Sequence, residues 1–217
     1  MPPIVSFVGK STVGKTTLLE RLLSELKGRG YRLAAIKHVE RDFELDQQGK
    51  DSWRLARAGS DMVAISSPQK VAFIRSVERD STLEELSRFI GGDVDLVLTE
   101  GFKKGNAPKI EIHRRELGEL LCPPHQLLAI VSDEPLDLAV PQYSPDDTKG
   151  LADLIEQRFL LLRKEESLEL FVNGARVPLN PFVEGLFART LTGMVSALDG
   201  IGKIEGLDIQ MRRKSQP

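Results

Sequence analysis

The sequence predicts an α/β fold built on a mostly parallel, doubly wound sheet, and three observations lead to that prediction. First, short apolar segments alternate with amphipathic stretches along most of the chain, which is the order of β-α-β units. Second, the segment DVDLVLTEGF at residues 93–102 has the apolar centre of a strand that is buried on both faces. Third, a glycine-rich loop separates an apolar strand at residues 4–8 from a helical pattern.

The glycine-rich loop reads GKSTVGKTT and satisfies the pattern G-x-x-x-x-G-K-[ST] without a gap. Glycine lets the backbone curl so that successive N–H groups converge on one anion, and the following helix adds the positive end of its dipole. We therefore predict a nucleotide-binding P-loop, in which Lys15 reaches the terminal phosphates and Thr16 is a magnesium ligand. The other expected phosphate-contacting residues are Gly9, Ser11, Thr12, Val13, Gly14 and Thr17.

Apolar periodicity and turn residues define the next elements. Leu18, Leu22 and Leu26 recur at helical spacing within residues 16–30, so a helix is expected there with Gly28 and Gly30 as its stop. Residues 32–39 are the second strand of the expected sheet. The segments DMVAISSP and KVAFIRSV predict a strand pair with a proline at the break.

The rest of the expected domain, which ends at residue 163, contains two helices and three strands. Ser81 and Glu84 have the spacing of a capping box and predict the start of a helix over residues 81–90. Strands are expected within DVDLVLTEGF, PKIEIHR and LLAIVSDEP, and a helix is expected over residues 146–160. Because ligands of doubly wound sheets bind outside the carboxyl ends of the strands, the residues that follow each strand are candidate site residues.

Charged residues follow three of these strands. Glu100 leaves a buried strand and is expected either to hold magnesium through water or to orient an attacking water. Lys37 and His38 follow the second strand and are candidate nucleotide contacts. Asp133 stands where a carboxylate would accept the N1 and N2 protons of guanine, although a turn cap in S-D-E-P explains this residue equally well.

The composition of the chain indicates which classes of binding partner and which cellular compartment to expect. A net charge of −2 and a pI near 6.0 predict no general attraction to nucleic acid or to anionic membranes. No apolar run approaches the ~18–20 residues that a membrane span needs. The single cysteine, Cys122, excludes an internal disulfide and predicts a small buried residue in a reducing, cytoplasmic protein.

Three stretches together resemble one known family. They are GKSTVGKTTLLERLL, IKHVERDFELDQQGKDSWRLARAGSD and DLVLTEGFKKGNAPKIEIHR, which lie within residues 4–160. The resemblance is to molybdopterin-guanine dinucleotide biosynthesis protein B (MobB), a family of P-loop GTP-binding proteins in the class that includes nickel-insertion GTPases. It implies GTP and Mg²⁺ as cofactors, slow GTP hydrolysis, and a role in making or delivering the guanylated molybdenum cofactor.

The resemblance also implies partners and further site residues. The expected partners are a second copy of the chain in a homodimer, a molybdopterin guanylyltransferase, and molybdopterin or its guanine dinucleotide. In the loop KHVERDFELDQQGKDS, Asp46 is expected near magnesium as a second catalytic candidate beside Glu100, and Lys50 is expected near an anion. A solvated loop whose charges pair among themselves is the alternative interpretation of this stretch.

Two other functions share the P-loop. A metallochaperone GTPase usually needs clustered histidine or cysteine, whereas this chain has three scattered histidines and one cysteine. A small-molecule kinase closes a lid of arginines over the phosphates, for which Arg41, Arg54 and Arg57 are candidates. The sequence best fits a GTP-binding accessory protein with weak GTPase activity, and these two functions are the alternatives.

Residues 164–217 lie outside the resemblance and predict a small α+β module. The segment LELFVNGARVPLN has the pattern of a hairpin around Asn173 and Gly174, because both positions accept positive φ. Asn180 as a cap and Pro181 at the first position predict an apolar helix. The segment KIEGLDIQMR would return as a third strand and complete a ββαβ module. This module is expected to contact molybdopterin or a partner enzyme, or else only to stabilise the fold.

Overall fold

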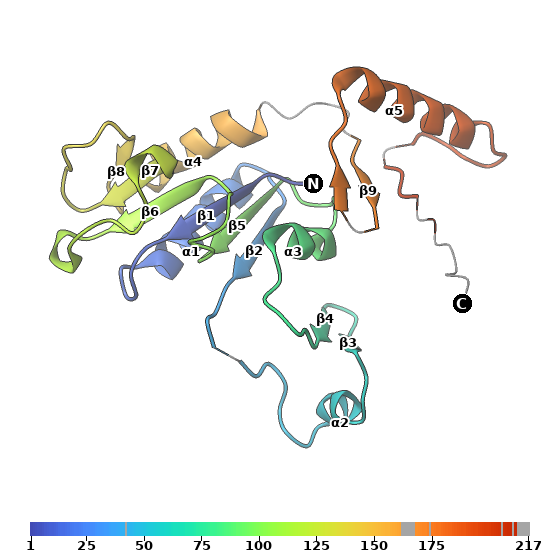
Figure 1. Cartoon of the computed structure of the whole chain (residues 1–217), viewed down its shortest axis with the longest axis horizontal. Coiled ribbons are helices and arrows are strands. Elements are labelled where there is room, and N and C mark those ends of the chain that lie inside the picture. Colours follow the sequence, from blue (N-terminus) through green and yellow to red (C-terminus); the bar gives the residue numbers. More distant parts are fainter. Residues whose placement is uncertain (42, 162–167, 174, 205, 210, 212–217) are drawn as a thin grey trace. The chain divides into compact units, whose positions relative to one another are not determined.

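A computed structural model describes residues 1–41, 43–161, 168–173, 175–204, 206–209 and 211. The chain divides into two compact units, residues 1–162 and 163–217. The first unit is built on a six-stranded sheet of order β2-β5-β1-β6-β7-β8, in which every neighbouring pair is parallel (Figure 1). The α/β fold with a mostly parallel sheet is therefore confirmed.

The first unit consists of short strands and helices with the following residue ranges. The sheet strands are β1 (Ile4–Val8), β2 (Leu33–Lys37), β5 (Leu96–Glu100), β6 (Lys109–His113), β7 (Leu127–Ser132) and β8 (Gln142–Tyr143). The helices are α1 (Lys15–Gly28), α2 (Asp51–Arg57), α3 (Leu83–Ile90) and α4 (Thr148–Ile155), and the short helical turns are η1 (Arg115–Leu117), η2 (Pro124–Gln126) and the π-helical η3 (Glu156–Leu160). Outside the sheet, β3 (Met62–Ser66) pairs antiparallel with β4 (Val71–Arg75), as predicted for a strand pair.

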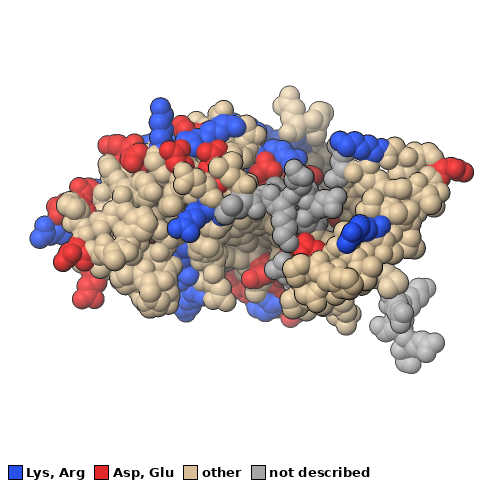
Figure 2. Space-filling model, turned by 90° about the horizontal axis from the view of Figure 1, so that it is seen from above, with Lys and Arg blue, Asp and Glu red and all other residues tan. Residues whose placement is uncertain are grey.

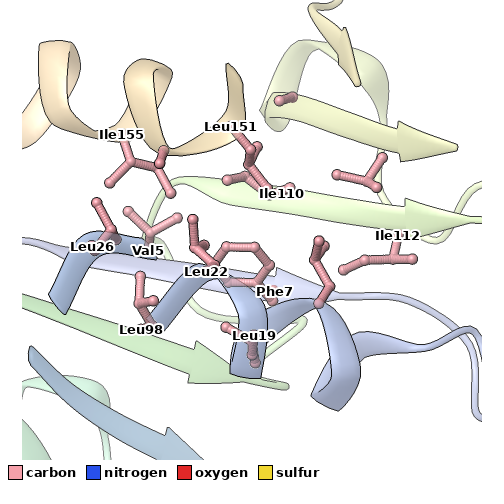
Figure 3. Packing of buried hydrophobic residues seen from close by; sticks show 14 of the residues in the cluster. Val5, Phe7, Leu19, Leu22, Leu26, Leu98, Ile110, Ile112, Leu151 and Ile155 are labelled. Carbon is pink, nitrogen blue, oxygen red and sulfur yellow. The ribbon is translucent and has the colours of Figure 1, made fainter. Parts of the chain in front are cut away.

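Helices α1 and α4 pack on one face of the sheet and form its apolar core. Leu22 and Leu26 of α1 are fully buried, as their helical spacing predicts; Leu22 lies beside Phe7 of β1 and Leu26 beside Val5 of the same strand (Figure 3). Leu151 and Ile155 of α4 close the same cluster. Each fully buried side chain of this size contributes about 1.5–3 kcal/mol of transfer free energy, so this face dominates the stability of the unit.

The opposite face of the sheet carries buried polar side chains. Successive residues of a strand point to opposite faces, so Ser6, Thr99 and Glu111 lie away from the α1 and α4 side. Thr99 Oγ1 donates a hydrogen bond to Ser6 Oγ at 2.9 Å. The carboxylate of Glu111, which is 1% exposed, accepts the backbone N–H groups of the loop residues Leu121 and Cys122 at 2.6 and 2.9 Å. Glu111 therefore fixes a loop over this face.

The start of α3 differs from the prediction by one residue. The side chain of Thr82, rather than that of Ser81, accepts the backbone N–H of Glu85, and the Glu85 carboxylate accepts the N–H of Thr82. The segment STLEE offers the capping-box spacing twice, to Ser81 with Glu84 and to Thr82 with Glu85. Arg79 holds the second arrangement, because its guanidinium binds Glu85 and lowers the pKa of that carboxyl to about 2, with help from the Thr82 N–H.

The second unit contains a hairpin and a helix. Strand β9 (Leu170–Val172) pairs antiparallel with β10 (Ala175–Val177), and Asn173 between them has the positive φ that the prediction requires. Gly174, the other predicted turn residue, lies outside the described residues. Helix α5 (Pro181–Ser196) begins after Asn180, whose side chain accepts the N–H of Val183 at 2.9 Å, so the predicted cap is confirmed.

The expected third strand of this unit is not found in the residues that the structure describes. Of KIEGLDIQMR, residues 203–204, 206–209 and 211 belong to no strand, and residues 205, 210 and 212 lie outside the described part. The described part of the module is thus ββα rather than ββαβ. Across the described residues of both units, no helix is long and apolar enough to cross a membrane.

The buried carboxylate of Glu111 generates a stability prediction. Glu111→Gln is expected to lower the free energy of unfolding by about 1–3 kcal/mol, because an amide can turn only one acceptor oxygen toward the two N–H groups. Urea denaturation measures the change. Glu119→Gln, at an exposed position nearby, should stay within about 0.5 kcal/mol of the parent. Equal effects of the two substitutions would contradict the structural role of Glu111.

Candidate functional site

The loop of residues 9–14 joins β1 to α1 and has the geometry of a phosphate loop. Gly9, Thr12 and Gly14 have φ of 155°, 67° and 95°. A Cβ on Gly9 would approach the Ile112 carbonyl oxygen of β6 to 2.5 Å, so only glycine fits there. The side chain of Val13 is buried in the core, which leaves its backbone N–H as its contribution to the site.

Lys15 opens α1, and its ammonium folds back over the loop. Its Nζ donates to the carbonyl oxygen of Lys10 at 2.7 Å and to that of Gly9 at 3.2 Å. Burial lowers the pKa of Lys15 from its ordinary value, the charge of Glu100 acts in the opposite direction, and the charges of Lys103 and Lys37 add to the lowering. A phosphate in the loop would offer this ammonium a stronger acceptor than the two carbonyls do.

Glu100 meets three of the predicted residues at the carboxyl edge of the sheet. Thr16 Oγ1 donates to Glu100 Oε2 at 2.8 Å, and Lys37 Nζ lies 3.6 Å from the same oxygen. Lys37 and Glu100 are register partners in β2 and β5, which explains why they face each other. The structure thus brings Lys15, Thr16, Lys37 and Glu100 together. A hydroxyl beside a carboxylate suits Mg²⁺, which prefers oxygen ligands, so Thr16 and Glu100 are the residues that would hold it.

His38 lies beside this cluster, but its side chain bonds to a residue outside the cluster. Its Nε2 is 2.8 Å from Asp80 Oδ2, and its ring packs on that of Phe102 with centroids 4.6 Å apart. Among the described residues, its side chain makes no hydrogen bond or ion pair with the phosphate loop. Its expected contact with the nucleotide stays a prediction. Asp80 carries no motif, so the sequence offers no signal that could have paired it with His38.

Three other candidates lie apart from the Glu100 cluster. Asp46 Oδ1 accepts the backbone N–H of Gln47 at 2.9 Å, and Lys50 immediately precedes α2 and lines a hollow between α2 and β3. Asp133 is exposed just beyond β7. In the described part of the chain, none of the three side chains is hydrogen-bonded or ion-paired to the phosphate loop or to Glu100, and their proposed roles stay predictions.

One contact of the phosphate loop has no signal in the sequence. Lys10 Nζ donates to the carbonyl oxygen of Leu117, which ties the phosphate loop to η1. The residues lie 107 positions apart, so no local pattern could predict the bond. His113, the last residue of β6, is only 8% exposed. Cys122 is buried as predicted, and burial raises the pKa of its thiol.

Three lysines concentrate positive charge at the site. Lys15 and Lys37 lie within reach of one carboxylate, and the charge of Lys103 also acts on Lys15. On the face shown in Figure 2, by contrast, Lys and Arg are interspersed with Asp and Glu. A local excess of cations at the carboxyl edge suits an anionic ligand.

Comparisons with known proteins agree with this geometry. The MobB family model, described as molybdopterin guanine dinucleotide synthesis protein B, matches residues 4–133. A molybdopterin-guanine dinucleotide biosynthesis adapter protein of Escherichia coli is 38% identical over 162 residues, which cover 71% of this chain and 92% of that protein. A relative from Methanocaldococcus jannaschii is 25% identical over 232 residues, which cover 96% of this chain and 97% of the relative.

Solved structures give the same result. A crystal structure of Bacillus subtilis MobB matches this chain with a TM-score of 0.60 and 30% sequence identity, over 72% of this chain and 98% of that one. The family match begins with β1 and ends at Asp133, so it contains the phosphate loop, the ends of β2 and β5, and the guanine candidate. The phosphate loop, the strand ends and the length of the match lead to one conclusion: the chain belongs to the MobB family.

Proposed function

We propose that this protein is a GTP-binding accessory protein with weak, magnesium-dependent GTPase activity in the formation or delivery of molybdopterin guanine dinucleotide. The observation that carries the proposal is the bond between Thr16 and Glu100 beside the loop lysine, in a member of the MobB family. The Escherichia coli relative, named as an adapter protein of this biosynthesis, supports the pathway. An adapter role makes a molybdopterin guanylyltransferase and molybdopterin or its guanine dinucleotide the expected partners.

The residues of the site divide the work between binding and hydrolysis. Lys15 and the N–H groups of the loop would hold the phosphates, while Thr16 and Glu100 would hold magnesium. The bound ion would neutralise charge on the phosphate oxygens. Glu100 already accepts a hydrogen bond from Thr16 and faces Lys37, so it is better placed to orient an ion or a water than to take a proton. This arrangement supports slow hydrolysis.

No specific observation favours either alternative function, the metallochaperone GTPase or the small-molecule kinase. Within the described residues, no group of three His, Cys, Asp or Glu side chains is arranged to hold a metal ion as a chaperone's cargo site would. The guanidinium of Arg57 stacks on Trp53 at 5.2 Å, and Arg54 pairs with Asp51 at 3.5 Å. These arginines are therefore engaged within α2, whereas a kinase lid needs them over the phosphates.

The proposal is tested first by calorimetric titration with GTP and ATP, each with and without Mg²⁺. Lys15→Ala is expected to weaken GTP binding by about 10- to 150-fold, because a hydrogen bond to a charged group contributes about 1.5–3 kcal/mol. The fold should survive, since the lysine lies on the loop rather than in the core. Lys27→Ala, an exposed lysine in the last turn of the same helix, is the matched control and should bind as the parent does. Parental affinity in Lys15→Ala would falsify the phosphate-loop assignment.

A second substitution separates binding from hydrolysis. Glu100→Gln is expected to keep GTP affinity within about threefold while magnesium-dependent phosphate release falls tenfold or more, about 1.4 kcal/mol of barrier. The exposed Glu84 on α3 provides the control substitution Glu84→Gln, which should change neither quantity. If Glu100→Gln hydrolyses GTP at the parental rate, Glu100 has only a structural role.

We also propose a homodimer that forms through β3 and β4. The two strands pair only with each other among the described residues, and Met62, Val71 and Phe73 are 49%, 58% and 66% exposed. Uncovered apolar strands are sites of pairing with another chain. Light scattering should give about twice the 24.1 kDa of one chain, and Phe73→Glu should shift the mass toward the monomer. A parent that scatters only as a monomer at working concentration rules this dimer out.

A further inference from the structure

The chain makes one long excursion from the sheet, and its two ends meet. We define the arm as residues 39–79, which contain α2, β3 and β4. His38 precedes the arm and Asp80 follows it, yet His38 Nε2 and Asp80 Oδ2 are 2.8 Å apart across 42 positions of sequence. The His38 side chain is 24% exposed and that of Asp80 is 74% exposed. The bond therefore closes the base of the arm.

On its other side, His38 touches three consecutive residues at the end of β5. Its backbone N–H donates to the carbonyl oxygen of Glu100 at 2.9 Å. A Cβ added to Gly101 would lie 3.0 Å from His38 Cβ, so the two residues are in close contact. The imidazole also packs on the ring of Phe102. His38 is thus placed to hold the turn that follows Glu100.

This turn needs support because its backbone is strained. Gly101 has φ of 107°, which glycine accepts, whereas Phe102 has φ of 55°. A left-handed conformation costs a residue with a side chain about 1–2 kcal/mol. Two backbone bonds help to offset that cost, from the Gly101 N–H to Phe7 O and from the Gly105 N–H to Phe102 O, both at 3.0 Å. The packing of the Phe102 ring on the imidazole of His38 is a further contact at the turn.

Two charges of the phosphate site flank the turn. Glu100 lies immediately before it and binds Thr16. Lys103 lies immediately after it, is exposed, and contributes to lowering the pKa of Lys15. A change in the turn would therefore move a negative and a positive charge of the site together.

Asp80 is itself held in place by the start of α3. Arg79 Nη1 donates to the Asp80 carbonyl oxygen at 3.0 Å, and the same guanidinium binds Glu85 in the capping box of that helix. The carboxylate that meets His38 is consequently presented from a fixed backbone. A chain of contacts leads from α3 through Asp80 and His38 to the turn.

We propose that Asp80 is a positioning residue of the phosphate site, which acts through His38 to hold the Glu100–Lys103 turn. The proposal deepens the proposed function and rests on it for its kinetic part. In the described part of the chain, the Asp80 side chain makes no hydrogen bond or ion pair with the phosphate loop or Glu100, so it would orient Glu100 through His38 rather than contact the nucleotide. Its loss should change the rate of hydrolysis more than the affinity for GTP.

The first test needs no nucleotide. Amide hydrogen exchange is measured on the full chain for Gly101 and Gly105, whose N–H groups report the turn. Asp80→Asn is expected to speed exchange at both amides by about fivefold, while Glu78→Gln, an exposed carboxylate two residues away, should leave both unchanged. Asp80→Glu keeps the carboxylate and should restore part of the protection. Parental exchange at both amides in Asp80→Asn overturns the proposal.

The second test uses GTP hydrolysis and separates a failure of this proposal from a failure of the proposed function. Asp80→Asn should lower kcat by about fivefold with KM within twofold of the parent. A raised KM at an unchanged kcat would mean that His38 and Asp80 serve nucleotide binding directly, which overturns the positioning role. If the parent binds no GTP, the proposed function fails, and the exchange measurement still decides whether Asp80 holds the turn.

Discussion

The parallel register of β2, β5 and β1 is the constraint on which the phosphate site depends. Side chains alternate along β5, so Leu98 faces the core under α1 and Thr99 faces Ser6 on the opposite side. Glu100 therefore returns to the α1 face, where Thr16 lies in the first turn of that helix. A slip of one residue would send the carboxylate to the other face and separate it from Thr16. The direction of the Glu100 side chain is thus set by the burial of Leu98 and Thr99, its neighbours in β5.

The two faces of the sheet are covered by segments that are held in different ways, helices by apolar packing on one face and loops by hydrogen bonds on the other. On the α1 and α4 face, apolar packing fixes both helices, which makes the start of α1 a rigid platform for Lys15 and Thr16. On the other face, Glu111 fixes a loop through directed hydrogen bonds, and Lys109 Nζ donates to the carbonyl oxygen of Gly105. Gly105 also closes the turn at Phe102. The turn beside Glu100 consequently rests on polar contacts and has less apolar packing to hold it than the phosphate loop has.

Sequence reasoning succeeded where a local pattern determines the structure. The phosphate loop and the position of Glu100 at the end of a buried strand both follow from a few adjacent residues, and the structure brings them together. It failed where tertiary contacts decide. Nothing in the sequence pairs His38 with Asp80, and the three charged or polar residues of KIEIH give no indication that all five residues of this strand are buried. The helix cap shifted to Thr82 because Arg79, outside the capping motif, binds Glu85.

The comparisons cover the two units of the chain to different extents. The match to the Escherichia coli relative covers 92% of that protein but only 71% of this chain. The matched part of this chain is therefore about as long as the first unit, residues 1–162. The Methanocaldococcus jannaschii match covers 96% of this chain and therefore extends into the second unit. No residue of α5 is buried, and Phe182 and Met194 on it are 75% and 65% exposed. The candidate residues of the phosphate site all lie in the first unit, whereas α5 is an exposed apolar helix beyond residues 4–133, which the family model matches.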